Sequence, residues 1–177
     1  MEDIEAATKT LLQAADDGEL KRLKKTAAAI DRVFGGGGVA AVIENTKDDH
    51  GRGAIHYAAT GGSVNVLKYL IQEIKIDVNL RDGDGATPLF RATIRGHLAA
   101  VEYLLGMGAN PELRDHGNLN PLHFAALKGH GHEHIIPLLL SKGIDVDDTN
   151  HYGSPLHYAA SFGTPETVKV LLDHGAN

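Results

Sequence analysis

Residues Asp82 to Asn110 read DGDGATPLFRATIRGHLAAVEYLLGMGAN, and this stretch decides the fold. It begins with a tight DGDG turn, continues through two short apolar runs separated at Gly96-His97, and stops at Gly108. The apolar runs have the length of short helices, and glycine is typical of helix ends. A segment this short cannot bury both apolar faces alone, so we expect it to stack on copies of itself.

The same pattern recurs along the chain at a nearly constant period. Ile55, Leu89, Leu122 and Leu156 begin equivalent runs, at spacings of 34, 33 and 34 residues. Three of the runs begin with a proline, which suits the first helical position, after a residue whose side-chain oxygen can cap the helix. These pairs are Thr87-Pro88, Asn120-Pro121 and Ser154-Pro155. Each run therefore predicts an inner helix.

A second helix follows in each unit, with apolar residues at i, i+3 and i+4 that form one stripe facing the inner helix. The stripes are Leu67, Leu70, Ile71; Val101, Leu104, Leu105; Ile136, Leu139, Leu140; and Val168, Leu171, Leu172. Glycines are expected to end both kinds of helix, and those after the inner helices are expected to be left-handed. Those after the inner helices are Gly62, Gly96, Gly129 and Gly163, and those after the outer helices are Gly108, Gly143 and Gly175.

These residues resemble the ankyrin repeat, whose fold is an all-α solenoid of helix-turn-helix units joined by hairpin turns. The resemblance covers about residues 11 to 177. The elongated first unit and the EIKIDVN join at Glu73–Asn79 are also similar to the ankyrin arm of plant ankyrin–TPR proteins. The expected divisions are a flexible N-terminus (1–10), an atypical capping repeat with a Gly-rich loop (11–47), and ankyrin repeats at 48–81, 82–114, 115–148 and 149–177.

The last expected repeat ends at Asn177 without a polar capping repeat after it. Repeat arrays need polar caps for solubility. We therefore expect either a longer protein of which this chain is a part, or a partner that covers the C-terminal face.

Composition excludes several classes of function. The 177 residues carry a net charge of −6, whereas a nucleic-acid-binding surface needs a basic face. No cysteine is present, which excludes disulfides and thiolate zinc sites. No segment has the length and apolarity of a membrane span, so we expect a cytoplasmic or nuclear protein.

Two groups of histidines are candidates for chemistry. His130, His132 and His134 lie close together and could form a metal site, but an alternating spacing within a turn does not define a tetrahedral geometry. We interpret them as a His-rich surface turn and keep a metal-binding regulatory module as the alternative. A second set, His56, His123 and His157, recurs at one repeat position, which indicates a shared structural role such as bonding the turn backbone.

The resemblance implies partner binding, and a repeat stack offers a continuous concave face of hairpin tips and inner helices. Apolar residues that packing does not require alternate there with arginine and tyrosine, a composition typical of interaction hot spots. The candidate residues are Arg81, Asp84, Ile94, Arg95, Arg114, His116, Leu119, Leu127, Lys128, His151, Tyr152 and Phe162. We expect a non-catalytic scaffold with a protein partner and no nucleic acid, membrane, small-molecule substrate, cofactor or metal. A rigid spacer without a ligand of its own is a further alternative.

Overall fold

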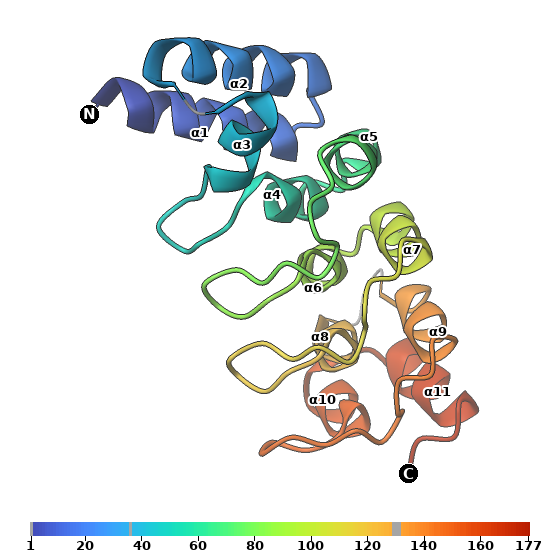
Figure 1. The fold of residues 1–177 in the computed structure, drawn as a ribbon. Coiled ribbons are helices and arrows are strands. Elements are labelled where there is room, and N and C mark those ends of the chain that lie inside the picture. Colours follow the sequence, from blue (N-terminus) through green and yellow to red (C-terminus); the bar gives the residue numbers. More distant parts are fainter. Residues whose placement is uncertain (1, 36, 129–131) are drawn as a thin grey trace.

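The computed structural model describes residues 2–35, 37–128 and 132–177, which fold into helix pairs without strands in the described ranges (Figure 1). The all-α prediction is confirmed. The helices are α1 (Glu2–Asp16), α2 (Leu20–Phe34), α3 (Val39–Asn45), α4 (Ala54–Thr60), α5 (Val64–Lys68) with its π-helical continuation η1 (Tyr69–Glu73), α6 (Pro88–Ile94), α7 (Leu98–Gly106), α8 (Pro121–Lys128), α9 (Ile135–Leu140), α10 (Pro155–Phe162) and α11 (Pro165–Asp173).

The helices form two rows. Inner helices α1, α4, α6, α8 and α10 contact one another in that order, and outer helices α5, α7, α9 and α11 form a second row (Figure 1). Helix α2 packs on α1, and α3 leads from α2 into the first turn. The turns at residues 46–53, 80–87, 113–120 and 147–154 project to one side, and we call them fingers 1 to 4.

The helix ends follow the predicted chemistry with one exception. Thr87 Oγ1 accepts a hydrogen bond from Phe90 N at 3.3 Å, and Gly62 and Gly96 have left-handed φ angles of 69° and 72°. The expectation for Gly163 is wrong, because its backbone is extended at φ −78°, ψ −169°. Thr164 must stay extended before Pro165, so the chain enters α11 without a left-handed turn. The expectation for Gly129 lies outside the described residues.

The core is the predicted apolar stripe of the outer helices together with the inner helices. Leu104, Leu139 and Leu171 are fully buried. Leu172 differs from the expectation, because 52% of its side chain is exposed. It lies on the last outer helix of the array, on an edge that no described helix covers.

The N-terminal segment also differs from the expectation. Residues 2–10, expected to be flexible, belong to α1, which has 15 residues compared with 7 in α4. Its sequence EDIEAATKTLLQAAD is rich in strong helix formers, and acidic residues in the first turn stabilise the helix dipole. The first unit is therefore a helix pair with an inner helix about twice the usual length.

One outer helix accommodates an extra residue. The join from Leu70 to Asp82 is one residue longer than the equivalent join from Leu104 to Asp115. Here α5 widens into η1, where Ile74 N donates to Tyr69 O at 3.1 Å, and Lys75 adopts φ 70°. A π-bulge absorbs an inserted residue without breaking the helix.

The recurring histidines have the expected structural role. His56 Nδ1 accepts from Gly53 N at 3.2 Å, while its Nε2 donates to Leu80 O at 3.0 Å. His157 Nδ1 similarly lies 3.2 Å from Ser154 N. His56 and His157 thus link helices α4 and α10 to the turn backbone.

The first prediction concerns the stripe. Leu104→Ala should lower the free energy of unfolding by about 2–5 kcal/mol, because it removes a fully buried side chain and leaves a cavity. Urea unfolding followed by circular dichroism measures this change. Leu172→Ala is the control and should cost far less, and equal costs for the two variants would contradict the packing described here.

The second prediction concerns the contact between α1 and α4. A Cβ atom at Gly61 would lie 1.9 Å from the Asp16 carbonyl oxygen, so Gly61→Ala should destabilise the protein by about 1–3 kcal/mol. Gly106→Ala is the matched control, because a Cβ there meets nothing within 4 Å and alanine favours helix. In thermal unfolding, Gly61→Ala should lower the melting temperature, whereas Gly106→Ala should leave it unchanged or raise it. Similar melting temperatures of the two variants would contradict the contact between α1 and α4.

The third prediction concerns pH. Burial lowers the pKa of His56 and of His123. Below about pH 6.5, the ordinary pKa of histidine, the unfolded chain therefore binds protons that the folded chain does not. Stability should therefore be fully present above that pH and fall as the pH drops through it. Phe90 occupies the equivalent position in the next repeat, which makes His56→Phe a suitable variant. Urea unfolding from pH 7.5 to 5 should show a shallower pH dependence for His56→Phe, and an unchanged slope would exclude this contribution.

Candidate functional site

Each finger is organised by one acidic or amide side chain. Asp82 Oδ1 accepts from Asp84 N and Ala86 N, both at 3.0 Å. Asp48, Asp115 and Asn150 accept backbone N–H groups at the equivalent position of the other fingers. Asp and Asn favour such turns because the side chain replaces a backbone acceptor. The four fingers therefore share one shape.

Neighbouring fingers are also joined to one another. Gly83 N donates to His50 O at 2.7 Å, and His116 N donates to Asp84 O at 2.8 Å. Arg81 donates from its guanidinium to Arg114 O. The first three fingers thus form a continuous backbone-bonded surface beside the inner helices (Figure 1).

Several arginines at the finger bases form ion pairs with carboxylates of the fingers. The Arg91 guanidinium lies 2.6 Å from both Asp82 and Asp84, and its hydrogen bond lowers the pKa of Asp84. Burial alone would raise the pKa of Asp48, but hydrogen bonds from Arg52 and Tyr57 hold it below the ordinary value.

The candidate partner-binding residues divide into three groups. Arg81 and Arg114 bond finger atoms, since Arg114 pairs with Asp148 and donates to Asn118 O at 3.0 Å. Ile94, Leu119 and Leu127 are half-buried. The third group consists of the remaining members, all exposed, of which Asp84 is paired with Arg91: Asp84, Arg95, His116, Lys128, His151, Tyr152 and Phe162.

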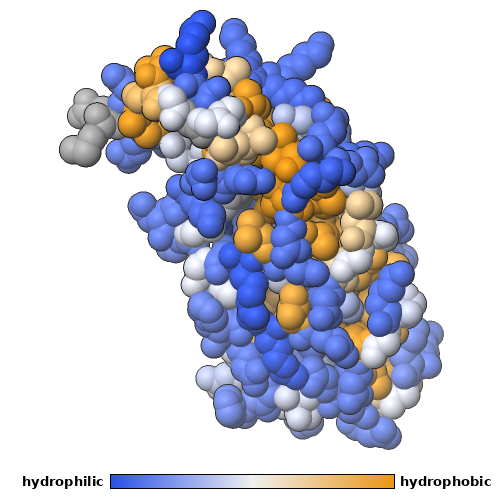
Figure 2. Space-filling model, viewed as in Figure 1, coloured by the Kyte–Doolittle hydropathy of each residue, from blue (hydrophilic) through white to orange (hydrophobic). Residues whose placement is uncertain are grey.

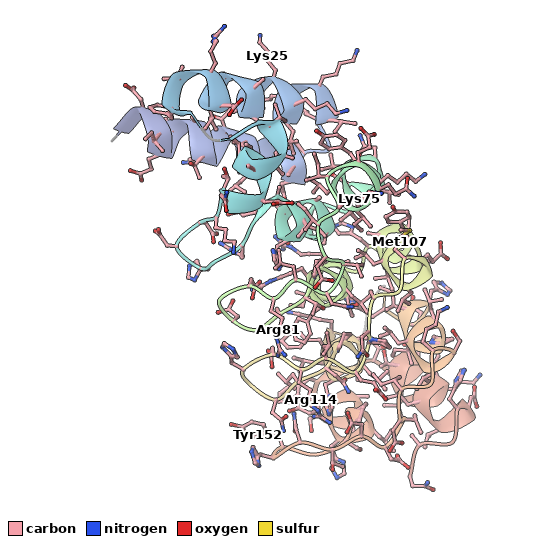
Figure 3. The ribbon with its side chains drawn as sticks, viewed as in Figure 1. Lys25, Lys75, Arg81, Met107, Arg114 and Tyr152 are labelled. Carbon is pink, nitrogen blue, oxygen red and sulfur yellow. The ribbon has the colours of Figure 1, made fainter. Side chains whose placement is uncertain are left out.

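Two aromatic residues stand out within the exposed group. Tyr152 is 79% exposed at finger 4 and Phe162 is 71% exposed at the end of α10, the highest values among the exposed large apolar side chains of the described residues (Figure 3 labels Tyr152). Large aromatic side chains usually bury most of their surface. Both belong to the last repeat, so the exposed aromatic surface lies at the C-terminal end of the array.

Sequence reasoning missed a groove at the opposite end. The first half of α1 extends past the N-terminus of α4 and, with finger 1, borders a cavity of about 520 Å³. Its apolar lining includes Ile4, Leu12 and Tyr57, and its charged lining consists of Glu5, Lys9, Lys47, Asp48 and Asp49. The spacing of Ile4, Thr8 and Leu12 at i, i+4 and i+8 was the available signal, because it places the three residues on one face of a helix.

The histidine-rich turn has a structural partner. His132 is buried, and its Nε2 lies 2.6 Å from Thr93 O, just as His97 Nε2 lies 2.8 Å from Thr60 O one repeat earlier. The interpretation of His132 as part of a surface turn is therefore wrong, since it fills the position of His97 in the repeat. His134 is exposed, and His130 lies outside the described residues. Within the described ranges, no group of three or more His, Cys, Asp or Glu side chains could hold a metal ion.

In the described part of the chain, no single helix is long and apolar enough to cross a membrane. Helices α2 and α3, which meet at an angle of 97°, satisfy the length and composition criteria only as a bent pair.

Comparisons with known proteins place the chain among repeat proteins. The model of ankyrin repeats in three copies matches residues 11–115 and 107–177. A transient receptor potential cation channel subfamily A member 1 homolog of Caenorhabditis elegans is 32% identical over 69% of this chain and 12% of the relative. The ankyrin repeat protein nuc-2 of Neurospora crassa is 31% identical over 97% of this chain and 15% of the relative. Ankyrin repeat domain-containing protein 63 of mouse is 31% identical over 94% of this chain and 42% of the relative.

The chain thus spans less than half the length of these relatives. The comparisons give no support to the closer resemblance to plant ankyrin–TPR proteins. The family match covers the helix pairs, capped inner helices and fingers described above. The chain therefore belongs to the ankyrin-repeat family.

Proposed function

We propose that the chain is a non-catalytic scaffold that binds a protein partner on the concave face of the array. Ankyrin repeats usually mediate protein–protein binding and are generally non-catalytic. The observation that carries the proposal is the pair of exposed aromatic side chains, Tyr152 and Phe162. Aromatic residues that are exposed in the free protein are typical anchors of a protein interface.

The charges of the concave face refine the proposal. The cations of Arg52, Arg91 and Arg114 are neutralised by finger carboxylates. Arg95 and Lys128 are exposed at equivalent repeat positions and form no ion pair with a described residue. A partner would therefore place apolar side chains on the aromatic residues and acidic side chains near these two cations.

The groove beside finger 1 extends the proposed surface toward the N-terminus. Its apolar lining at Ile4, Leu12 and Tyr57 and its mixed charges suit a peptide side chain rather than a nucleic acid.

We place the protein in the cytoplasm or nucleus. The metal-binding alternative is not favoured, because His132 bonds Thr93 O.

The fourth prediction tests the concave face. Quantitative affinity purification from cells should recover partners with the wild-type chain that are lost, by at least about tenfold, with Arg95→Glu/Phe162→Ala, since the change reverses one contact charge and removes one aromatic anchor. Leu172→Ala is the matched control, because it truncates an exposed apolar side chain on an outer helix.

The outcomes distinguish the proposals. Loss with the double variant and retention with Leu172→Ala would support the concave face. Equal recovery by all three proteins would overturn it, and recovery of no specific partner by the wild type would favour a rigid spacer. Circular dichroism spectra of each variant exclude unfolding as the cause.

A further inference from the structure

A second surface lies at the other end of the molecule, on α2. Lys21, Lys25 and Arg32 are spaced at i, i+4 and i+11, which places them within one narrow stripe of a helix. All three are exposed, and Lys25 projects away from the neighbouring repeats (Figure 3). The chain as a whole is acidic, so a basic stripe on one helix is unusual for it.

These three cations differ from their neighbours because they are unpaired. Arg22 lies 3.0 Å from Glu19, and Lys24 lies 3.6 Å from Glu73 and over the Tyr69 ring. Within the described ranges, Lys21, Lys25 and Arg32 form no ion pair. The stripe therefore carries a positive charge that no carboxylate of the described residues neutralises.

An apolar groove runs beside the stripe. Between α1 and α2 it has a volume of about 360 Å³, and its lining residues are Asp3, Ala7, Thr26, Ala29, Ile30, Val33 and Phe34. Val33 is 65% exposed and Phe34 is 46% exposed. Figure 2 shows apolar residues gathered at this end of the molecule. The small lining residues Ala7, Thr26 and Ala29 would let another helix approach closely, and the larger apolar lining residues could contact its sides.

We propose that this surface binds an acidic amphipathic helix of a partner protein. The apolar face of that helix would fill the α1–α2 groove, and its carboxylates would pair with Lys21, Lys25 and Arg32. A helix rises about 1.5 Å per residue, so carboxylates at i, i+4 and i+11 of a parallel helix, or at i, i+7 and i+11 of an antiparallel helix, would match the stripe. This surface is separate from the concave face and does not depend on the function proposed there.

The observations favour a helix over an anionic membrane. Asp3 lines the groove and would repel anionic headgroups. A helix can instead keep its carboxylates on the side of the cationic stripe and its apolar residues over the groove. A second copy of this chain offers no such matched stripe on α1 or α2, because no three acidic residues of either helix are spaced at i, i+4 and i+11.

The fifth prediction uses a defined probe. A stapled 18-residue helical peptide carries leucines on one face and glutamates at i, i+4 and i+11 beside them, and its control has lysines in place of the glutamates. Fluorescence anisotropy should show binding of the acidic peptide to the full chain, with at least about tenfold weaker binding of the lysine peptide. Lys25→Glu/Arg32→Glu should weaken the acidic peptide about tenfold or more, and Val33→Ser should also weaken it.

Lys169→Glu is the matched control variant, because Lys169 is exposed on α11 at the far end of the array. It should leave peptide binding unchanged. NMR amide shifts should map to α1 and α2, and circular dichroism should show each variant folded.

Three outcomes would overturn the proposal. The first is the absence of shifts on α1 and α2 at millimolar acidic peptide, and the second is equal affinity for both peptides. The third is a failure to bind the acidic peptide together with one of two other results. These are binding to phosphatidylserine vesicles, or self-association in sedimentation that Val33→Ser abolishes.

Discussion

The fold depends on the burial of each repeat's apolar face against the next repeat. An inner helix of seven or eight residues paired with an outer helix of similar length is too short to be stable in isolation. Contacts between successive inner helices bury Leu89 and Leu122 completely, and those between successive outer helices bury Leu104 and Leu139. Polar groups reinforce this arrangement, because His97 and His132 each form a hydrogen bond with the last turn of the inner helix of the preceding repeat. The array is therefore cooperative between neighbours, and its apolar core is one continuous cluster that runs along the stack.

Much of this architecture could be predicted from the sequence, because the signals are local and repeated. Thr87-Pro88 specifies a helix start through a cap and a preset φ angle, and Gly96 specifies its end through a left-handed turn. The four-fold recurrence turned these weak signals into a reliable register. The exception at Gly163 arose because the following Thr-Pro pair, a strong helix start in its own right, overrides the usual glycine turn.

The N-terminal unit was harder to predict, because it lacks the repeat signature. Polar residues at 1–10 suggested a flexible end, although their helix propensity was high and tertiary contact with α2 decides the outcome. The grooves beside α1 depend on that helix and were missed with it. At the candidate site, repeat position identified exposed residues such as Tyr152 and Phe162. It did not reveal that Arg114 is engaged by Asp148, since that pairing joins different fingers.

The distribution of charge separates the two proposed surfaces physically. In the fingers, arginines and aspartates satisfy one another, so the cost of removing them from water is already met and little net charge remains for a partner. Recognition on the concave face should then depend mainly on aromatic contact and shape, with a salt dependence limited to the contribution of Arg95 and Lys128. On α2 the cations are solvated and unpaired, so association there should depend on long-range attraction and weaken as ionic strength rises. A single chain could in this way hold two partners through interactions that respond differently to the same change in conditions.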